Sequence, residues 1–162
     1  MELRDATPED APVIAAIYNH YVSTTTISFE EETVSAATMC ERIRAVQDAG
    51  LPWLVASVDG ELAGYAYATP WRVRPAYRFS VETSVYVAHD KPRRGLGRAL
   101  YTMLLARLRQ GQIHLVIGGI ALPNAPSVAL HEAMGYEKAA HFSEVGRKFD
   151  RWVDVGYWQL RL

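Results

Sequence analysis

The alternation of apolar and polar positions changes its period several times along this chain, and each change marks an expected element. The N-terminal part follows the helical period in two segments, after a short strand expected at residues 3–4. The apolar positions that recur on one helix face are Ile14, Ile17, Tyr18 and Tyr21 in the first segment, and Met39, Ile43 and Val46 in the second. Thr7-Pro8 is a typical helix start, and the second helix is expected from about Ser35 to Gly50. Between them, residues 23–29 are polar and β-branched, which indicates a loop or an extended segment.

The rest of the chain begins with a strand-rich stretch and ends with strands that alternate with helices. Strands are expected at residues 53–58, 62–71, 79–87, 115–121, 136–144 and 153–160. Asp59-Gly60 separates the first two, and both residues tolerate the positive φ of a two-residue hairpin turn. The helical period returns at residues 97–109 and 126–134, and Gly135 is placed to end the second of these helices. The run at 115–121 is almost continuously apolar, which predicts burial on both faces.

This order of elements predicts a mixed α/β (α+β) domain with helices on both faces of one sheet. A length of 162 residues suits a single domain over residues 1–162. The formal net charge of −1 provides no long-range attraction to nucleic acid or to acidic membranes. No apolar run approaches the length of a membrane span, the N-terminus lacks a signal pattern, and the lone Cys40 indicates a reducing cytoplasm.

The strand at 79–87 carries a carboxylate, Glu82, and leads into a Gly-x-Gly turn. Gly95-Leu96-Gly97 opens the following helix. Glycines let backbone N–H groups converge on an anion, and a helix N-terminus adds partial positive charge. The basic residues around this turn are Lys91, Arg93, Arg94 and Arg98. The pattern indicates a phosphate site, and a tight strand-to-helix connection with solvated arginines is the alternative. It is not a Walker A loop, and it lacks the third glycine and later acid of a dinucleotide fingerprint.

Several separate segments of the chain occur in an order that is typical of one enzyme superfamily. They are Val85-Tyr86-Val87, Arg93-Arg94-Gly95-Leu96-Gly97-Arg98-Ala99-Leu100 and residues 122–136, together with residues 17–21, 52–56, 65–68, 70–72, 81–87 and 152–159. These segments resemble the GNAT superfamily of acetyl-CoA-dependent N-acetyltransferases, and more closely its phosphinothricin and methionine sulfoximine N-acetyltransferases. The resemblance covers nearly the whole chain. It implies the GNAT fold, a mixed and mostly antiparallel sheet whose central strands splay apart, with helices on both faces.

The resemblance also implies how acetyl-CoA is held. The main-chain groups of Val85, Tyr86 and Val87 are expected to pair with the pantetheine amides, as an added strand would. The residues expected to cradle the pyrophosphate are Arg93, Arg94, Gly95, Leu96, Gly97 and Arg98. Asn124, with Ser127 nearby, is expected to hold the pantetheine arm. Pro92 departs from the family pattern, which has Arg or Gln three residues before the first glycine, so only the backbone cradle is expected there.

Acetylation of an amine needs a base for the ammonium, polarisation of the thioester carbonyl, and a proton for the departing thiolate. Strict alternation places Glu82, Ser84 and Tyr86 on one side of their strand, and a partly buried carboxylate has a raised pKa. The resemblance assigns Glu82 the role of base, directly or through a water, and a rim glutamate paired with an arginine is the alternative. His131 is the candidate acid, with a purely structural histidine as its alternative. The backbone N–H of Val85 is a candidate donor to the thioester oxygen.

The amine side of the site must hold an amino acid carboxylate. Arg72 and Arg74 are the candidates, because guanidinium binds carboxylate bidentately, and the resemblance favours Arg72. Phe29 and Glu30 belong to a segment that resembles the loop lining the subfamily's substrate pocket, although Phe29 is equally credible as core. The aromatic residues that are candidates to wall a small closed pocket are Trp71, Tyr77 and Phe79.

The resemblance further implies a homodimer, because Lys148, Phe149 and Trp152 lie in a segment similar to the subfamily's dimer-proximal loop. An ordinary hairpin tip is the alternative reading of that segment. No metal site is expected, since the histidines have no paired ligand spacing, and no Gly-x-Ser-x-Gly elbow of a serine hydrolase occurs.

The expected function is therefore transfer of acetyl from acetyl-CoA to the α-amino group of a small amino acid analogue. Phosphinothricin, methionine sulfoximine and methionine sulfone are the candidate substrates that the resemblance provides. Two alternatives stay open: an acetyltransferase acting on a protein or peptide, and a non-catalytic acyl-CoA-binding module. A peptide substrate needs an open groove, and a binding module has no use for Glu82.

Overall fold

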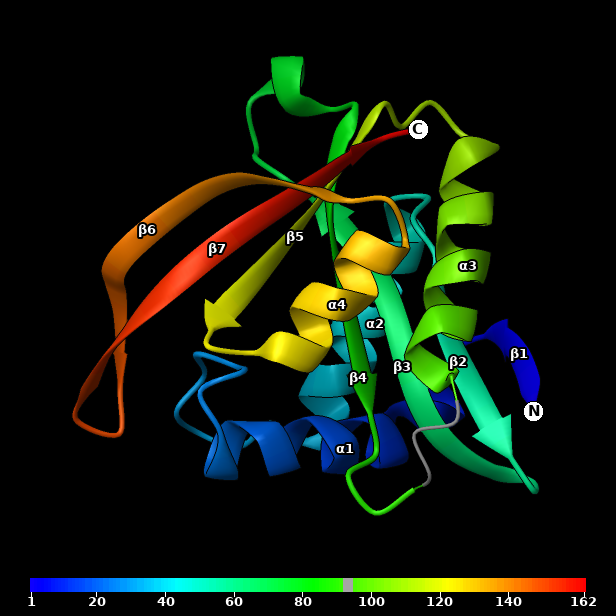
Figure 1. Ribbon diagram of the computed structural model, residues 1–162. Helices are drawn as coiled ribbons and strands as arrows, with labels where there is room; N and C mark the ends of the chain where they lie inside the picture. Colours follow the sequence, from blue (N-terminus) through cyan, green and yellow to red (C-terminus); the bar gives the residue numbers. More distant parts are fainter. Residues whose placement is uncertain (92–94) are drawn as a thin grey trace.

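A computed structural model of the chain describes residues 1–91 and 95–162 (Figure 1). The strands are β1 (Glu2–Asp5), β2 (Trp53–Val58), β3 (Glu61–Pro70), β4 (Ser80–Val87), β5 (Leu115–Leu122), β6 (Glu137–Lys148) and β7 (Arg151–Arg161). The α-helices are α1 (Ala11–Thr24), α2 (Ala36–Asp48), α3 (Leu96–Arg109) and α4 (Ala125–Ala133), with 3-10 turns η1 (Pro8–Asp10) and η2 (Pro75–Tyr77). None of the helices in the described part of the chain is long and apolar enough to cross a membrane.

The strands form one sheet in the order β1-β2-β3-β4-β5-β7-β6. Every neighbouring pair is antiparallel except β4 and β5, which run parallel. β4 and β5 pair over three positions only, from Ser80 opposite Leu115 to Glu82 opposite Ile117, whereas β4 stays paired with β3 up to Val87. Beyond Glu82 the two central strands therefore diverge, and the predicted splay in a mixed, mostly antiparallel sheet is confirmed.

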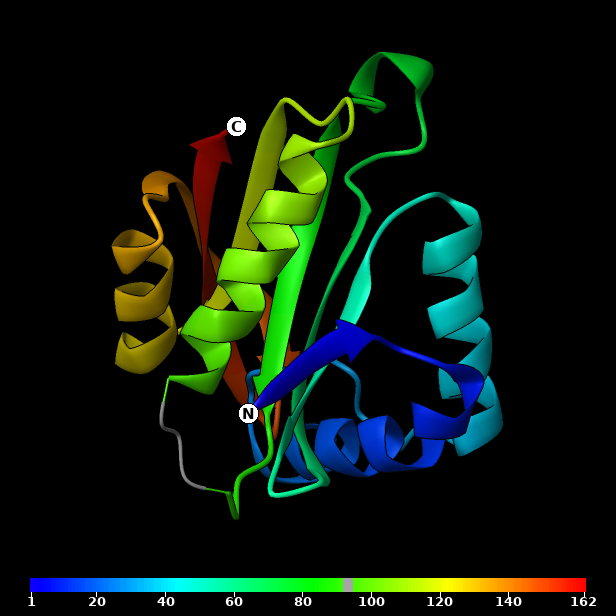
Figure 2. The same ribbon diagram turned by 90° about the vertical axis from the view of Figure 1, so that its right-hand side faces the viewer.

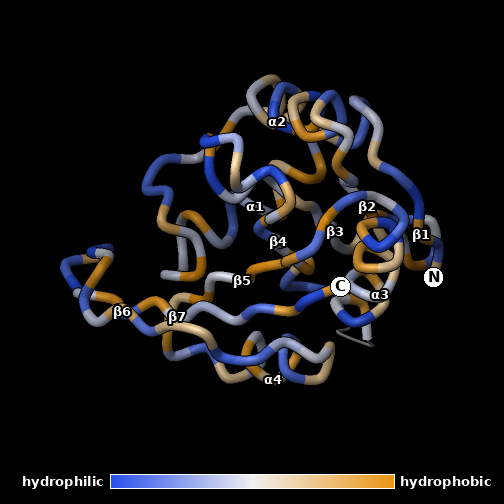
Figure 3. Tube along the Cα trace, turned by 90° about the horizontal axis from the view of Figure 1, so that it is seen from above, coloured by the Kyte–Doolittle hydropathy of each residue, from blue (hydrophilic) through white to orange (hydrophobic). Residues whose placement is uncertain are grey.

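Helices cover both faces of the sheet, as predicted (Figures 2 and 3). On one face α3 and α4 pack through buried leucines of α3 such as Leu100, Leu104 and Leu108. On the other face α1 and α2 pack through Ile14, Ile43 and their neighbours against Trp53 and the tyrosines of β3 and β4. The inward positions expected for these helices are buried, apart from Tyr21, which is partly exposed. The splay between β4 and β5 thus opens between two packed helical layers.

The boundaries of the elements follow the local chemistry of the sequence. Strand β2 has the predicted bounds, and Asp59 and Gly60 turn it into β3 with φ values of 52° and 82°. Ser35 caps α2 by accepting a hydrogen bond from the Thr38 N–H, and Gly135 ends α4 with φ 90°. Helix α1 follows directly on the 3-10 turn η1 and ends at Thr24. It thus includes the first two residues of the segment 23–29 that was expected to be a loop or extended.

Two expectations about the C-terminal strands need correction. Strand β6 continues to Lys148 and β7 begins at Arg151, so they make a hairpin much longer than predicted, because their pairing resumes after each bulge. This hairpin extends beyond the rest of the molecule (Figures 1 and 3). The apolar run of β5 is not buried on both faces throughout, since Gly119 is exposed between buried Gly118 and Ile120.

Candidate active site

The free edge of β4 follows from the alternation of its backbone hydrogen bonds. Trp71 N–H donates to Ser80 O at 3.1 Å and Ala88 N–H donates to Ala63 O at 2.8 Å, so the even-numbered residues of β4 direct their backbone groups to β3. The N–H and C=O groups of Val85 and Val87 therefore point into the splay. Tyr86, whose backbone groups face Tyr65 of β3, is not available for strand-like pairing, which corrects that part of the expectation.

A groove of about 480 Å³ runs along this free edge. Its lining brings together the predicted residues Val85, Tyr86, Val87, Gly95, Leu96, Gly97, Arg98, Asn124 and Ser127, with Tyr21, Ile27, Pro126 and Leu130. The Tyr21 hydroxyl donates to the Val87 carbonyl, which leaves the Val85 N–H and C=O and the Val87 N–H as groups that the splay presents. An extended chain carrying amides fits this edge as an added strand.

The end of the groove lies at the N-terminus of α3. Gly95 caps the helix in the left-handed region, with φ 74°, and its carbonyl accepts from Ala99 N–H at 2.9 Å. The N–H groups of Leu96, Gly97 and Arg98 belong to the first turn, which has no intrahelical acceptors. They form an anion site of the kind found at helix N-termini. Lys91 pairs with Glu61, and Pro92, Arg93 and Arg94 lie outside the described residues.

Helix α4 packs close to the N-terminus of α3 because Gly97 of α3 faces it. A Cβ at Gly97 would lie 3.1 Å from Leu130 Cδ2, so the bare glycine lets α3 and α4 approach. Asn124 caps α4, and its side-chain oxygen accepts from Ser127 N–H at 3.3 Å. The Asn124 side chain also has an amide NH₂ that can donate hydrogen bonds, and Asn124 lines the groove. The residues expected to hold the arm of acetyl-CoA are thus gathered around one groove.

Glu82 lies in a second cavity, of about 470 Å³, on the α1 side of the sheet. This amine pocket, as we call it from here on, is lined by Tyr18, Ile27, Ser28, Phe29, Glu30, Glu82, Ser84, Tyr86, Gly119, Ala121, Val155 and Tyr157. The predicted alternation thus holds, since Glu82, Ser84 and Tyr86 share it. Burial raises the pKa of the Glu82 carboxyl above its ordinary value, and the Arg72 guanidinium lowers it by a smaller amount. A carboxyl in this state suits a base that operates near neutral pH.

A narrow cavity of about 50 Å³ joins the groove to the amine pocket. It shares Val85, Asn124 and Ser127 with the groove, and Ser84, Gly119 and Ala121 with the amine pocket. Tyr101 and His131 close it from the α3 and α4 side. The two larger cavities therefore meet where β4 and β5 separate, within reach of the Val85 N–H.

His131 is 3% exposed, and both of its ring nitrogens have partners. Nδ1 lies 2.7 Å from the Ser127 carbonyl, which can only accept, so Nδ1 carries the proton. Nε2 then accepts from the Tyr101 hydroxyl at 3.1 Å. Burial lowers the pKa of the imidazole, and the hydrogen bond to Ser127 opposes that shift. The acid role predicted for His131 needs a proton on the cavity side, whereas this arrangement favours a neutral ring that acts as an acceptor there.

Both arginines expected to bind a carboxylate, Arg72 and Arg74, line a cleft other than the amine pocket. The charge of Arg72 nevertheless acts on Glu82 and Tyr157, which places it beside the amine pocket, and its guanidinium stacks over Trp71 at 4.9 Å. Arg74 caps η2 and is not among the groups whose charge acts on Glu82. Trp71 reaches the pocket through an edge contact with Tyr157, at 5.6 Å between centroids. Tyr77 and Phe79 are exposed and do not line the amine pocket, which contradicts the expectation for those two aromatics.

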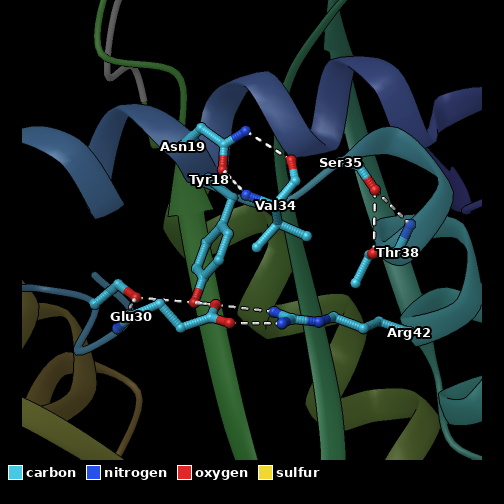
Figure 4. A network of polar contacts seen from close by, with 8 residues as sticks. Tyr18, Asn19, Glu30, Val34, Ser35, Thr38 and Arg42 are labelled. Atoms are coloured by element: carbon cyan, nitrogen blue, oxygen red, sulfur yellow. Dashed lines mark hydrogen bonds and ion pairs between the residues drawn. The ribbon is translucent and has the colours of Figure 1, made fainter. Parts of the chain in front are cut away.

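The loop between α1 and α2 forms one wall of the amine pocket and is fixed by a polar network (Figure 4). Arg42 binds Glu30 with two hydrogen bonds, of 2.5 and 2.9 Å, and the Tyr18 hydroxyl also donates to Glu30. The Asn19 side chain pairs with both backbone groups of Val34, each at 2.8 Å. Phe29 is 42% exposed and covers Gly146, so it is a pocket residue and not part of the core.

Sequence reasoning missed several residues of this site. Lys148 was expected near a partner chain, but it is 2% exposed and donates to Val22 O and Ser28 O, both at 2.7 Å. Tyr18 was expected only as a core residue, and Tyr157 was not singled out at all. The described residues contain no group of three or more His, Cys, Asp or Glu side chains that is arranged to hold a metal ion.

The arrangement of groove, junction and buried carboxylate agrees with what similar proteins are. The family model described as "Acetyltransferase (GNAT) domain" matches residues 3–156. The chain is 43% identical to a phosphinothricin N-acetyltransferase of Streptomyces viridochromogenes over 159 residues, which cover 98% of this chain and 86% of that protein. It is 40% identical to an L-methionine sulfoximine/L-methionine sulfone acetyltransferase of Pseudomonas paraeruginosa, over 99% of this chain and 94% of that protein.

The fold agrees equally well with a solved structure. A GNAT superfamily phosphinothricin acetyltransferase from Sinorhizobium meliloti, solved in complex with AcCoA, superposes with a TM-score of 0.96 at 35% sequence identity. The match covers 99% of this chain and 88% of that one. The likeness therefore extends over the whole sheet and all of its helices.

Proposed function

Because the chain belongs to the GNAT family of acetyltransferases, we propose that it is an acetyl-CoA-dependent N-acetyltransferase acting on the α-amino group of a small amino acid analogue. Relatives named for phosphinothricin, methionine sulfoximine and methionine sulfone make these compounds the first candidates. Each combines an amino acid head with a tetrahedral polar tail. The observation that carries the proposal is the buried Glu82 carboxylate, which lines an amine pocket joined to the splay of β4 and β5.

The residues on the cofactor side fit acetyl-CoA as co-substrate. Val85 N–H and C=O and Val87 N–H offer the pattern that the pantetheine amides require. The first-turn N–H groups of α3, from Leu96 to Arg98, are suited to the pyrophosphate, with Arg93 and Arg94 proposed to assist from beside them. Asn124 and Ser127, at the start of α4, face the arm between these two sites.

On the amine side, we assign Glu82 the role of base. An amino acid's ammonium group is mostly protonated at neutral pH, so one proton must leave before the nitrogen can attack. Glu82 takes that proton, either directly or through one water, and the neutral amine then bonds to the thioester carbon. The Val85 N–H donates to the carbonyl oxygen as negative charge develops on it. The bond between carbon and sulfur breaks, and the second proton of the nitrogen passes to the departing thiolate in the cavity that Tyr101 and His131 line, while Glu82 returns its proton to solvent.

Arg72 is proposed to bind the substrate carboxylate from beside the amine pocket, where its charge acts on Glu82. Its guanidinium can form two parallel hydrogen bonds to a carboxylate, and it stacks over Trp71, whose ring contacts Tyr157. Phe29, which lines the amine pocket, is proposed to contact the side chain of the amino acid. Arg74 lines the same cleft as Arg72, but its charge is not among those that act on Glu82, so Arg74 is not retained in the carboxylate site.

We also propose that the protein is a homodimer whose contact includes the β6–β7 hairpin. Large apolar side chains are exposed along it: Phe142 by 50%, Val145 by 58%, Phe149 by 52% and Trp152 by 61%. Apolar side chains that gather on a protruding element are typical of an association surface. Phe142 touches the ring of Tyr157, so this hairpin also borders the amine pocket.

Release of free thiol from acetyl-CoA, measured across a panel of amines, tests the proposed function. The panel contains the three candidate analogues, ordinary amino acids, polyamines and a short peptide with a free N-terminus. We expect turnover with at least one analogue, and Glu82→Gln should lower kcat by about 100-fold or more, within the range for loss of a general base. Acetyl-CoA binding by this variant should be unchanged. Turnover with the peptide alone would overturn the substrate class, and near wild-type turnover of Glu82→Gln at saturating amine would remove the base.

A further inference from the structure

A glycine and a tyrosine face each other across two strands beside the Glu82 carboxylate. β5 and β7 are antiparallel, and Gly119 lies directly opposite Tyr157. A Cβ built at Gly119 would lie 3.1 Å from Tyr157 Cε1 and 3.2 Å from Glu82 Oε1. The tyrosine ring therefore folds over the bare glycine, and its edge meets the carboxylate above that position. Aromatic rings commonly cover a glycine on the neighbouring strand in this way.

The ring of Tyr157 is held from two further sides. Trp71 meets it edge to face at 5.6 Å and 78°, and Phe142 does the same at 5.9 Å and 82°. Such aromatic contacts restrict a ring to one orientation. Burial raises the pKa of the Tyr157 phenol, the Glu82 charge adds to that shift, and Arg72 opposes it. The Glu82 carboxyl and the Tyr157 phenol thus line the same part of the amine pocket, and the charge of the exposed Arg72 reaches both.

Gly119 has a second property that concerns the reaction itself. It is exposed, and it lines both the amine pocket and the narrow junction with the groove. A side chain at this position would project into the space between Glu82 and the thioester end of the groove. The attacking nitrogen has to pass through that space.

We propose that Tyr157 is a positioning residue for acetyl transfer and that Gly119 is the bare position that lets it act. The ring covers one side of Glu82, which keeps the carboxylate directed at the amine and keeps water away from it. The gap left by Gly119 sets the width of the passage, so the pocket selects amino acids whose Cβ carries no branch. This inference rests on the proposed function and adds to it a determinant of geometry and of substrate width.

Two variants of Tyr157 separate the ring from its hydroxyl. Tyr157→Phe keeps the cover and should stay within about threefold of wild-type kcat/KM for the amine. Tyr157→Ala removes the cover and should lower it by about 100-fold, the cost of small misplacements in an active site. The acetyl-CoA KM should be unchanged in both variants, because Tyr157 does not line the groove. If Tyr157→Ala does not fold, Tyr157→Leu replaces it, since leucine fills space without covering the carboxylate.

The pH profile of kcat/KM provides a readout that a merely structural role would not move. The titratable and charged groups that act on Glu82 or share its pocket are Arg72, Tyr157, Tyr67, Tyr101, Tyr18, Tyr86 and Glu30. Tyr157→Ala removes the ring that shields Glu82 and leaves the other groups in place. Water then reaches the Glu82 carboxyl, and the pKa of Glu82 falls toward its ordinary value. The acidic limb should therefore move to lower pH in Tyr157→Ala and stay in place in Tyr157→Phe.

Gly119→Ala tests the same corner from the opposite strand, and Gly111→Ala is its matched control. A Cβ at Gly111 meets nothing closer than Leu108 O at 3.5 Å, an ordinary contact. Gly119→Ala should lower kcat/KM by about 10-fold or more, with a steeper loss for amino acids that are branched at Cβ, while Gly111→Ala should match wild type. An inactive wild type would overturn the proposed function. An active wild type whose Tyr157→Ala and Gly119→Ala variants keep its kinetics and pH profile would overturn this inference alone.

Discussion

At the scale of single residues, burial of the Glu82 carboxyl works against folding at neutral pH. Its pKa in the folded protein lies above the ordinary value of 4.5, chiefly because of desolvation. Between these two pKa values the folded state binds more protons than the unfolded state, so stability falls as pH rises through this window. The group proposed as base is therefore one whose ionisation destabilises the fold, a common property of functional sites.

We expect Glu82→Gln to be more stable than wild type at pH 7.5 and equal to it at pH 4. Glutamine has nearly the same shape and no charge, so it removes the desolvation penalty, whereas at pH 4 the wild-type carboxyl is itself mostly protonated. Thermal melts followed by circular dichroism at both pH values measure the difference in Tm. Glu41→Gln, on the exposed side of α2, is the control and should show no such pH-dependent gain. A lower Tm for Glu82→Gln at pH 7.5 would contradict the origin assigned to the raised pKa.

The buried histidine illustrates the limit of a resemblance at this scale. Its position in α4 suggested an acid, but the backbone carbonyl of Ser127 fixes the proton on Nδ1. Gly118 completes the arrangement, because a Cβ there would lie 2.5 Å from His131 Nε2. A side chain at Gly118 on β5 would push the His131 ring out of its place. This steric dependence of α4 on β5 is not visible in the sequence of either segment alone.

At the scale of elements, the loop between α1 and α2 is tied to the β6–β7 hairpin by a buried ammonium, in addition to the contact of Phe29 with Gly146. Lys148 donates to Val22 O and Ser28 O, residues more than a hundred positions earlier in the chain. The same loop provides Phe29 and Glu30 to the amine pocket. Its position, and with it the shape of the pocket, therefore depends on the far end of the hairpin.

We expect Lys148→Met to raise the amine KM by about 10-fold while the acetyl-CoA KM stays unchanged. Methionine fills the space, but it leaves two buried carbonyls without donors, at a cost of about 1–3 kcal/mol each, which should also lower Tm. Steady-state kinetics with each substrate varied in turn measure the effect. Lys138→Met is the matched control, because Lys138 is exposed and lies away from this loop. Equal changes in both KM values would contradict a local role of Lys148 in the pocket.

Much of the element plan was predictable, because it depends on local signals. The caps, the Asp59-Gly60 turn and the apolar periods determine β2, β3, α2 and α3 almost to the residue. The surroundings of Glu82 were not predictable in the same way. Tyr157 reaches it from a strand seventy positions later, across a glycine, and Lys148 is buried by a loop that precedes it in the chain. Such contacts arise from the register of non-neighbouring strands, which no local pattern encodes.

At the scale of the whole molecule, the parallel pairing of β4 and β5 is the feature that creates both substrate sites. Parallel neighbours that separate after three positions leave one strand edge free inside the sheet, where helices cover both faces. Acetyl-CoA is proposed to complete that edge, and the amine is proposed to reach it from the α1 side. The two substrates then meet within the sheet and not on its surface, and this geometry keeps water from the thioester.

The hairpin that extends beyond this body gives the last prediction. Its exposed apolar side chains include Val145 and Trp152, and its Phe142 touches Tyr157 at the amine pocket. If two chains pair through it, the protein should elute and scatter light as a particle of twice the 18.1 kDa chain mass. Glutamate at positions 145 and 152 together should give monomers, because burying two unpaired charges in an apolar interface costs several kcal/mol in total.

Val13→Glu is the matched control, since Val13 is an equally exposed apolar residue, on α1 and away from the hairpin, and this variant should keep the wild-type mass. Loss of the partner should also raise the amine KM. The hairpin, which carries Phe142 and Lys148, then loses the contacts with the partner that restrict its position. The acetyl-CoA KM should stay constant, as no residue of the hairpin lines the groove. A wild-type protein that remains monomeric at micromolar concentration would contradict dimerisation through the hairpin. A monomeric variant with an unchanged amine KM would show that dimerisation does not shape the amine pocket.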